Sequence, residues 1–123
     1  MIKGFEAITA DLSDDELNMV QIVVKGLKVK HGKDMAVTGA VICKALNISG
    51  VRLRKMINYI RINNLIPALC SSSKGYFVAT NINELEDYII SLKQRIKAQV
   101  DVLNALERQT IFFGGTGQTS LFE

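Results

Sequence analysis

Two helical patterns in the middle of the chain are separated only by residues 47–50, Asn-Ile-Ser-Gly. Apolar residues recur at steps of three and four over residues 38–46, and the same spacing returns over residues 51–63. Ser49 suits the start of the second helix, because its hydroxyl can accept a hydrogen bond from a free amide of the first turn. We expect Ile48 to enter the core from the turn. This region therefore predicts two helices joined by a short turn.

The flanking segments predict a further helix on one side and a β-hairpin on the other. Ser13 and Glu16 have the spacing of a capping box, so a helix should begin there. Its expected apolar face consists of Leu17, Val20, Val24 and Leu27. Residues 65–70 and 76–80 are short runs of branched and aromatic residues around a polar tip, as in a hairpin. Pro67 restricts the first run to an edge or irregular strand.

The last helical pattern is the longest and runs from Asn81 or Asn83 to about Gln109. Its apolar residues keep mostly to steps of four, three and seven, with a polar interruption near Gln99, as in a short heptad seam. Residues 114–117, Gly-Gly-Thr-Gly, are typical of a flexible tether.

Charge is distributed unevenly along the chain. The formal net charge is only +3, but no Asp or Glu occurs between Met35 and Asn83. That segment carries six cations: Lys44, Arg52, Arg54, Lys55, Arg61 and Lys74. Such a segment indicates a localised anionic partner, although a solvated basic surface would have the same composition.

The stretch from Ile42 to Arg54 resembles the helix-turn-helix of bacterial and phage DNA-binding proteins, with a small residue between the helices, an apolar residue in the turn and a capping Ser. The stretch from Ile60 to Tyr76 is similar to the recognition-helix end and wing of small phage-encoded winged-helix proteins. The resemblance covers roughly residues 13–109. It implies a mainly α fold with a small β-hairpin wing, that is, a winged helix-turn-helix plus a long C-terminal helix. The expected parts are an N-terminal arm (1–12), a winged-helix domain (13–82), the C-terminal helix (83–110) and a flexible tail (111–123).

A recognition helix buries one face and offers the other to the major groove of DNA. The inner face of this helix is expected to consist of Leu53, Met56, Ile57 and Ile60. The residues that should then face outward are Arg52, Lys55, Asn58 and Tyr59, with Arg54 on a flank. Arg and Lys can read guanine or hold phosphates, Asn can read adenine, and the amides at a helix start suit a phosphate. The predicted DNA-binding residues are Ser49, Gly50, Arg52, Arg54, Lys55, Asn58, Tyr59 and Lys74.

The expected function is therefore sequence-preferring binding to double-stranded DNA, as an accessory replication or transcription factor. The resemblance above implies that the protein is phage-related. Two alternatives stay open: a plain dimeric transcriptional regulator, and a winged-helix protein-interaction adaptor that does not bind DNA.

The far end of the long helix needs a partner, because a helix of about 40 Å exceeds what a domain of ~70 residues can cover. Tyr88, Ile89 and Leu92 are expected to pack on the domain, which leaves Val100, Leu103 and Leu106 uncovered. A second copy is the simplest partner, so we expect a homodimer through the C-terminal helix. The alternative is that the first helix and the N-terminal arm cover this surface.

The C-terminal tail resembles the short peptide by which bacterial DNA polymerases and repair proteins dock on the sliding clamp. The matching residues are Gln118, Ser120, Leu121 and Phe122, whereas Thr119 departs from the usual Leu. Leu121 and Phe122 would fill an apolar pocket. The alternative is that the tail packs on the body of the protein or on a dimer mate.

Few residues are candidates for enzymatic chemistry. We therefore expect that the protein is not an enzyme and that it has no catalytic residues, no metal and no cofactor. His31 is the only histidine, and no cluster has metal-ligand spacing. Cys43 and Cys70 are expected to be free thiols in a reducing compartment. No run approaches the ~20 apolar residues needed to span a bilayer, and the N-terminus lacks the apolar stretch of a signal peptide. These features predict a cytoplasmic protein without a membrane partner.

Overall fold

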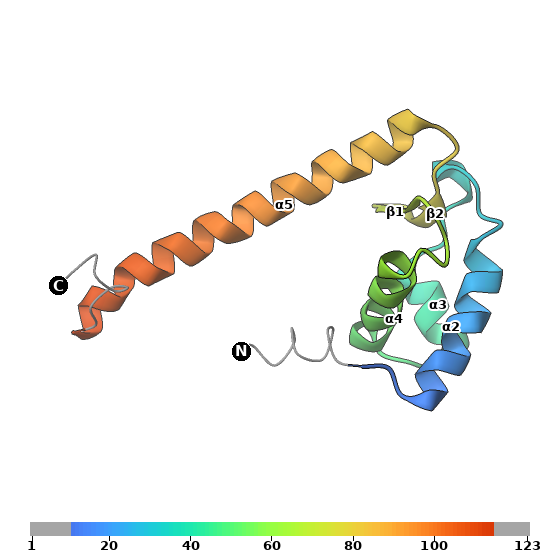
Figure 1. Cartoon of the computed structure of the whole chain (residues 1–123), viewed down its shortest axis with the longest axis horizontal. Helices are drawn as coiled ribbons and strands as arrows, with labels where there is room; N and C mark the ends of the chain where they lie inside the picture. Colours follow the sequence, from blue (N-terminus) through green and yellow to red (C-terminus); the bar gives the residue numbers. More distant parts are fainter. Residues whose placement is uncertain (1–10, 115–123) are drawn as a thin grey trace. The chain divides into compact units, whose positions relative to one another are not determined.

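The structure is a computed structural model that describes residues 11–114 of the 123-residue chain (Figure 1). Its elements, in order, are α2 (Asp14–Leu27), η1 (Lys33–Met35), α3 (Gly39–Leu46), α4 (Gly50–Ile62), β1 (Leu69–Ser72), β2 (Gly75–Val78), α5 (Ile82–Gln109) and η2 (Thr110–Phe113). The described part is mainly helical with one small antiparallel sheet, as predicted. The chain divides into two units, Met1–Tyr88 and Ile89–Glu123. Among the described helices, none combines the length and apolar character that a membrane span requires.

Three of the predicted helix starts are set by side-chain caps. The Glu16 amide donates to Ser13 Oγ at 3.2 Å, and the Ser13 amide donates to Glu16 Oε1 at 2.9 Å, which completes the capping box. The Thr38 and Ser49 hydroxyls each accept one amide of the first turn of α3 and α4, at 3.3 and 3.2 Å. Each cap satisfies an amide that the helix itself leaves free.

The turn between α3 and α4 is closed by Asn47 and Ile48. Asn47 ends α3 in the left-handed conformation with φ 55°, which Asn tolerates better than most residues. The Ile48 amide then donates to the Cys43 carbonyl at 3.0 Å, and the Ile48 side chain packs against the core as predicted. Ser49 follows at once and begins α4, so the two helices are held next to each other by a very short connection.

The core of the first unit lies where α2 and α4 pack together with the hairpin. Leu53, Met56, Ile57 and Ile60 of α4 are all buried, so the predicted inner face of this helix is confirmed. The predicted face of α2 was partly wrong. Its buried residues are Glu16, Val20, Val23 and Leu27, whereas Leu17 is exposed. The inner face of α2 is therefore turned from the predicted one toward Glu16, whose carboxylate pairs with Arg52 and Lys55 of α4.

The hairpin begins later than predicted. β1 pairs with β2 from Leu69↔Val78 to Ser72↔Gly75, so the tip shrinks to Ser73 and Lys74. Pro67 lacks an amide and Ala68 has φ 60°, and neither residue can extend an ordered strand at that point.

The other edge of β2 is paired with the connection between α2 and α3. The Tyr76 amide donates to the Val37 carbonyl at 2.8 Å, and the Val37 amide donates back to the Tyr76 carbonyl at 2.9 Å. Gly75 has φ 118°, and a Cβ there would lie 2.3 Å from the Val37 oxygen. Only glycine therefore allows the hairpin to approach this connection so closely.

α5 begins at a cap around Asn81 and runs to Gln109, in agreement with the predicted limits. The Glu84 amide donates to Asn81 Oδ1 at 3.0 Å, and Glu84 Oε1 accepts the Thr80 amide at 2.8 Å. Tyr88 lies in the first unit, where its ring is near Arg61, but Ile89 and Leu92 are each 40% exposed. Ile89 and Leu92 belong to the second unit, so their expected packing on the domain stays a prediction.

Candidate nucleic-acid interface

The first turn of α4 forms an accessible surface. Ser49, Gly50 and Arg54 are exposed, and Arg54 makes no ion pair with a described carboxylate. A Cβ built on Gly50 would lie 3.2 Å from Arg54 Nη1, so the guanidinium lies over the start of its own helix. Lys44 of α3 is also exposed. Arg54 therefore places a cation over the N-terminus of α4, and a helix N-terminus itself favours negative charge.

Arg52 and Lys55 are not free on the outer face of α4, which corrects the sequence-based prediction. Arg52 Nε lies 3.3 Å from Glu16 Oε2, and Lys55 Nζ lies 2.9 Å from Glu16 Oε1. The exposed fractions of the side chains are 41% for Arg52, 15% for Lys55 and 6% for Glu16. A carboxylate this deeply buried needs compensating charge, and α4 supplies it from the flank that meets α2.

The Glu16 carboxylate is strongly stabilised in its charged form. The hydrogen bond from the Ser13 amide, then those from Lys55 and Arg52, hold the pKa of Glu16 at about 2, against an ordinary value of 4.5, although burial opposes the shift. One residue therefore both caps α2 and joins α2 to α4.

This lowered pKa predicts an acid-sensitive contribution to folding. Because the folded-state pKa lies below the unfolded one, the contribution is complete above about pH 4.5 and is lost as the pH falls toward 2. We expect the loss to be about 2 kcal/mol, after allowing for solvent screening. Urea unfolding of the wild type and of Glu16→Gln at pH 7, 4 and 2.5 measures it. The gap between the two proteins should close with falling pH, and a constant gap would contradict the assignment.

Arg61 is an internal connection rather than part of a basic surface. Its Nε donates to the Leu69 carbonyl at 2.9 Å, and its guanidinium carbon lies 5.8 Å from the Tyr76 ring centre and 5.0 Å from that of Tyr88. It therefore links the end of α4 to both strands and to the first turns of α5. This role of Arg61 was not predicted, although its position four residues after the buried Ile57 places it at the edge of the inner face of α4.

The remaining predicted contacts differ in accessibility. Asn58 and Tyr59 are half-buried, and Tyr59 packs against the core. Lys74 is exposed at the hairpin tip, with Nζ 3.6 Å from Asp34 Oδ1 in a pair that solvent screens. The predicted docking residues Gln118, Ser120, Leu121 and Phe122 lie outside the described residues.

The described residues contain no group of three or more His, Cys, Asp or Glu side chains that could hold a metal ion. Cys43 and Cys70 are free thiols, and burial raises the pKa of Cys70, which makes its reactive thiolate form less accessible. Comparison of the chain with models of protein families, with curated proteins and with solved structures gives no match.

Proposed function

We propose that this protein binds double-stranded DNA through a winged helix-turn-helix and acts as an accessory replication or transcription factor. In this proposal α3 and α4 form the helix-turn-helix, α4 is the recognition helix, and the β1–β2 hairpin is the wing. The observation that carries the proposal is the short, capped turn from Asn47 to Ser49, which leads into a helix start with exposed cations. This arrangement can insert the start of α4 into the major groove while α2 packs against the inner face of α4.

We propose fewer DNA-contacting residues than the sequence predicted. Ser49 and Gly50 would approach a phosphate, Arg54 a phosphate or a guanine edge, and Lys74 the backbone from the wing tip. Lys44 adds a further cation. It belongs to the basic segment of the sequence but was not among the predicted DNA-binding residues. Arg52 keeps part of its surface in solvent, whereas Lys55 is held by Glu16 and is no longer among the proposed contacts.

Salt dependence tests the proposal. Three cations at the interface of each copy, Lys44, Arg54 and Lys74, imply about three phosphate contacts per copy. The binding of one copy should therefore weaken about 40-fold between 50 and 200 mM salt, and the binding of a dimer that engages both copies should weaken more steeply. Fluorescence anisotropy with a labelled random-sequence duplex measures this change. Absence of binding at 50 mM salt would contradict DNA binding and would favour the interaction adaptor.

We further propose a homodimer formed by α5. Ile89, Ile96 and Leu103 occupy one set of heptad positions, and Leu92, Gln99 and Leu106 occupy the other. The five apolar members are between 40% and 57% exposed in the single chain. Ile at the first position with Leu at the second favours a parallel coiled coil of two helices. We expect the one polar residue in this seam, Gln99, to help to fix the register of the two helices. Two copies joined this way would carry two recognition helices.

Sedimentation equilibrium tests the dimer. The wild type should have twice the mass of one chain, and Ile96→Glu combined with Leu103→Glu should have the mass of one chain, because two charges would enter the seam of each copy. Ile90 is also exposed but lies outside the heptad positions, so Ile90→Glu is the matched control and should stay dimeric. A dimeric double variant would exclude this interface.

Docking of the C-terminal tail on a bacterial sliding clamp stays a prediction from Gln118, Ser120, Leu121 and Phe122. A pull-down with purified clamp should retain the wild type and lose Phe122→Ala. Failure of the wild type to bind would leave a plain dimeric regulator.

A further inference from the structure

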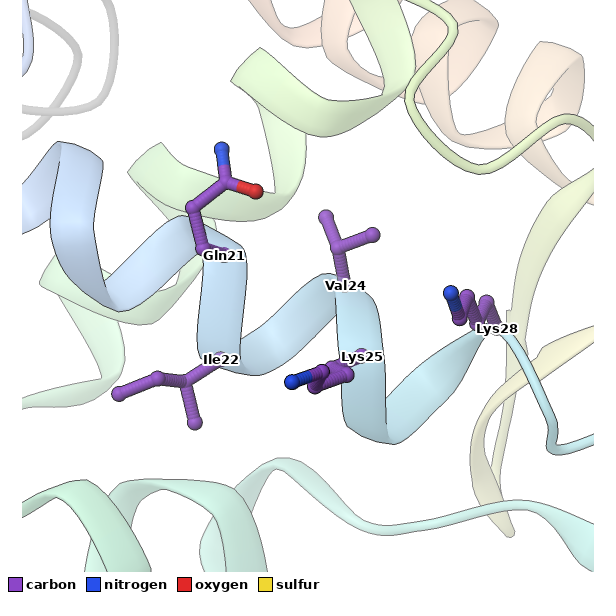
Figure 2. Close-up of a pocket in the computed structure, with 5 residues that line it drawn as sticks. All are labelled: Gln21, Ile22, Val24, Lys25 and Lys28. Atoms are coloured by element: carbon purple, nitrogen blue, oxygen red, sulfur yellow. The ribbon is translucent and has the colours of Figure 1, made fainter.

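An apolar groove runs between α2 and α3, away from the cations of α4. It has a volume of about 390 Å³. Ile22, Gly26 and Leu27 line it from α2, and Val41, Ala45 and Leu46 line it from α3. Ile22 is 59% exposed and Val41 is 58% exposed, so the groove is open to solvent at both edges. Figure 2 shows Ile22 and Val24 projecting from opposite sides of α2. Val24 packs against the core, whereas Ile22 is left for the groove.

Gly26 has no role in the packing of the first unit. A Cβ built on it would meet nothing within 4 Å. Its backbone is helical rather than left-handed, so it does not serve as a helix-ending glycine. A glycine inside a helix costs up to about 1 kcal/mol relative to alanine. The use of glycine facing an open groove therefore points to a second backbone that approaches α2 closely at this position.

The border of the groove is positively charged. Lys30 lines the groove, and Lys25 and Lys28 line a neighbouring pocket that shares Ile22 with it (Figure 2). No Asp or Glu lines either cavity. Within the described residues, none of these three lysines forms an ion pair. Lys28 lies about 200° around α2 from Gly26 and therefore on the opposite face of the helix, whereas Lys25 is the neighbour of Gly26. The groove therefore combines an apolar floor with two uncompensated lysines, Lys25 and Lys30.

We propose that this groove binds an amphipathic α-helix of a partner protein. The apolar side of that helix would fill the space between Ile22 and Val41, its backbone would cross α2 at Gly26, and its acidic residues would face Lys25 and Lys30. From Ile22 to Lys30 the groove spans about 12 Å, which is about two turns of a bound helix. Binding of an amphipathic helix with its apolar face in a hydrophobic groove is a recurring mode of peptide recognition.

Charge argues against a second copy of this chain in the groove. In a two-fold symmetric pair the same surface meets itself, so the lysine border of one copy would face that of the other. The proposal concerns a different surface from the first turn of α4, and it stands whether or not the protein binds DNA.

A phage-displayed library of helical peptides of about 15 residues tests the groove. Each peptide carries a leucine stripe flanked by Glu, Gln or Lys at random, and the bait is the full chain. We expect Glu-flanked peptides to be enriched at least about tenfold over Lys-flanked ones on the wild type. That enrichment should vanish on Gly26→Leu, because the new side chain would extend into the groove from a Cβ that meets nothing within 4 Å.

Asn18→Leu is the matched control, because it adds the same side chain to the exposed surface of α2 outside both cavities. It should select the same peptides as the wild type. Equal enrichment on wild type and Gly26→Leu, or no preference for Glu over Lys, would overturn the proposal. A change of sedimentation mass caused by Gly26→Leu would overturn it in favour of a second copy in the groove.

Discussion

Glu16→Ala should lower the midpoint of thermal unfolding by about 10–20 °C. The substitution leaves Lys55 almost enclosed without a counter-charge, removes one partner of Arg52, and breaks the capping box of α2. Removing one partner of a fully buried pair costs about 3–5 kcal/mol, and the partial exposure of Arg52 reduces this to about 2–3 kcal/mol. For a unit of this size each kcal/mol corresponds to about 4–8 °C. Circular dichroism during heating measures the change.

Two further variants separate the charge of Glu16 from its capping role. Glu16→Gln keeps an oxygen for the Ser13 amide but loses the charge, so it should lie between the wild type and Glu16→Ala. Asp15→Ala removes a neighbouring exposed carboxylate that has no ion pair with a described residue, and should change the midpoint little. If Glu16→Ala unfolded at the temperature of Asp15→Ala, the ion pairs would not hold α2 to α4.

Gly75→Ala should be at least as damaging, with a loss of more than about 3 kcal/mol. The new Cβ would lie 2.3 Å from the Val37 oxygen and 2.6 Å from the Thr38 nitrogen, and φ 118° is strained for any residue with a side chain. Relief requires the hairpin to separate from the connection before α3, which breaks the paired hydrogen bonds of Val37 and Tyr76. Urea unfolding should show a much lower midpoint, or the variant should fail to fold.

Gly26→Ala is the matched control for this prediction. The same methyl group added at Gly26 meets nothing within 4 Å and improves helix propensity, so stability should rise by a few tenths of a kcal/mol to about 1 kcal/mol. Equal effects of the two alanine substitutions would show that the approach of Gly75 to Val37 does not constrain the fold.

Local signals in the sequence predicted most of the helical framework. Ser13 and Ser49 identified helix starts because a cap depends on residues only three positions apart. The inner face of α4 was also predictable, since four apolar residues at helical spacing define a single direction. The predicted start of the hairpin was wrong, because the strand limits depend on the backbone of Pro67 and Ala68 and on pairing with Val37, which is remote in sequence.

The orientation of Arg52 and Lys55 was mispredicted for a physical reason. Glu16 has an obvious local role in the capping box, which concealed its second role as a buried counter-charge. Its spacing to Val20, Val23 and Leu27 does place it on the inner face of α2, so this role was open to inference. That the carboxylate meets Arg52 and Lys55, however, follows from the packing of α2 on α4, which no local pattern contains. The first turn of α4 and Lys74 keep the accessibility that the sequence suggested.

The most direct test of duplex binding at the start of α4 compares two variants with equal loss of charge. Lys44→Ala with Arg54→Ala removes two exposed cations at the proposed interface, and Lys97→Ala with Arg108→Ala removes two exposed cations from α5. By fluorescence anisotropy on the same labelled duplex at 50 mM salt, the first pair should weaken binding about tenfold, and the second less than about threefold. Equal weakening by both pairs, or none by the first, would contradict DNA binding through this surface.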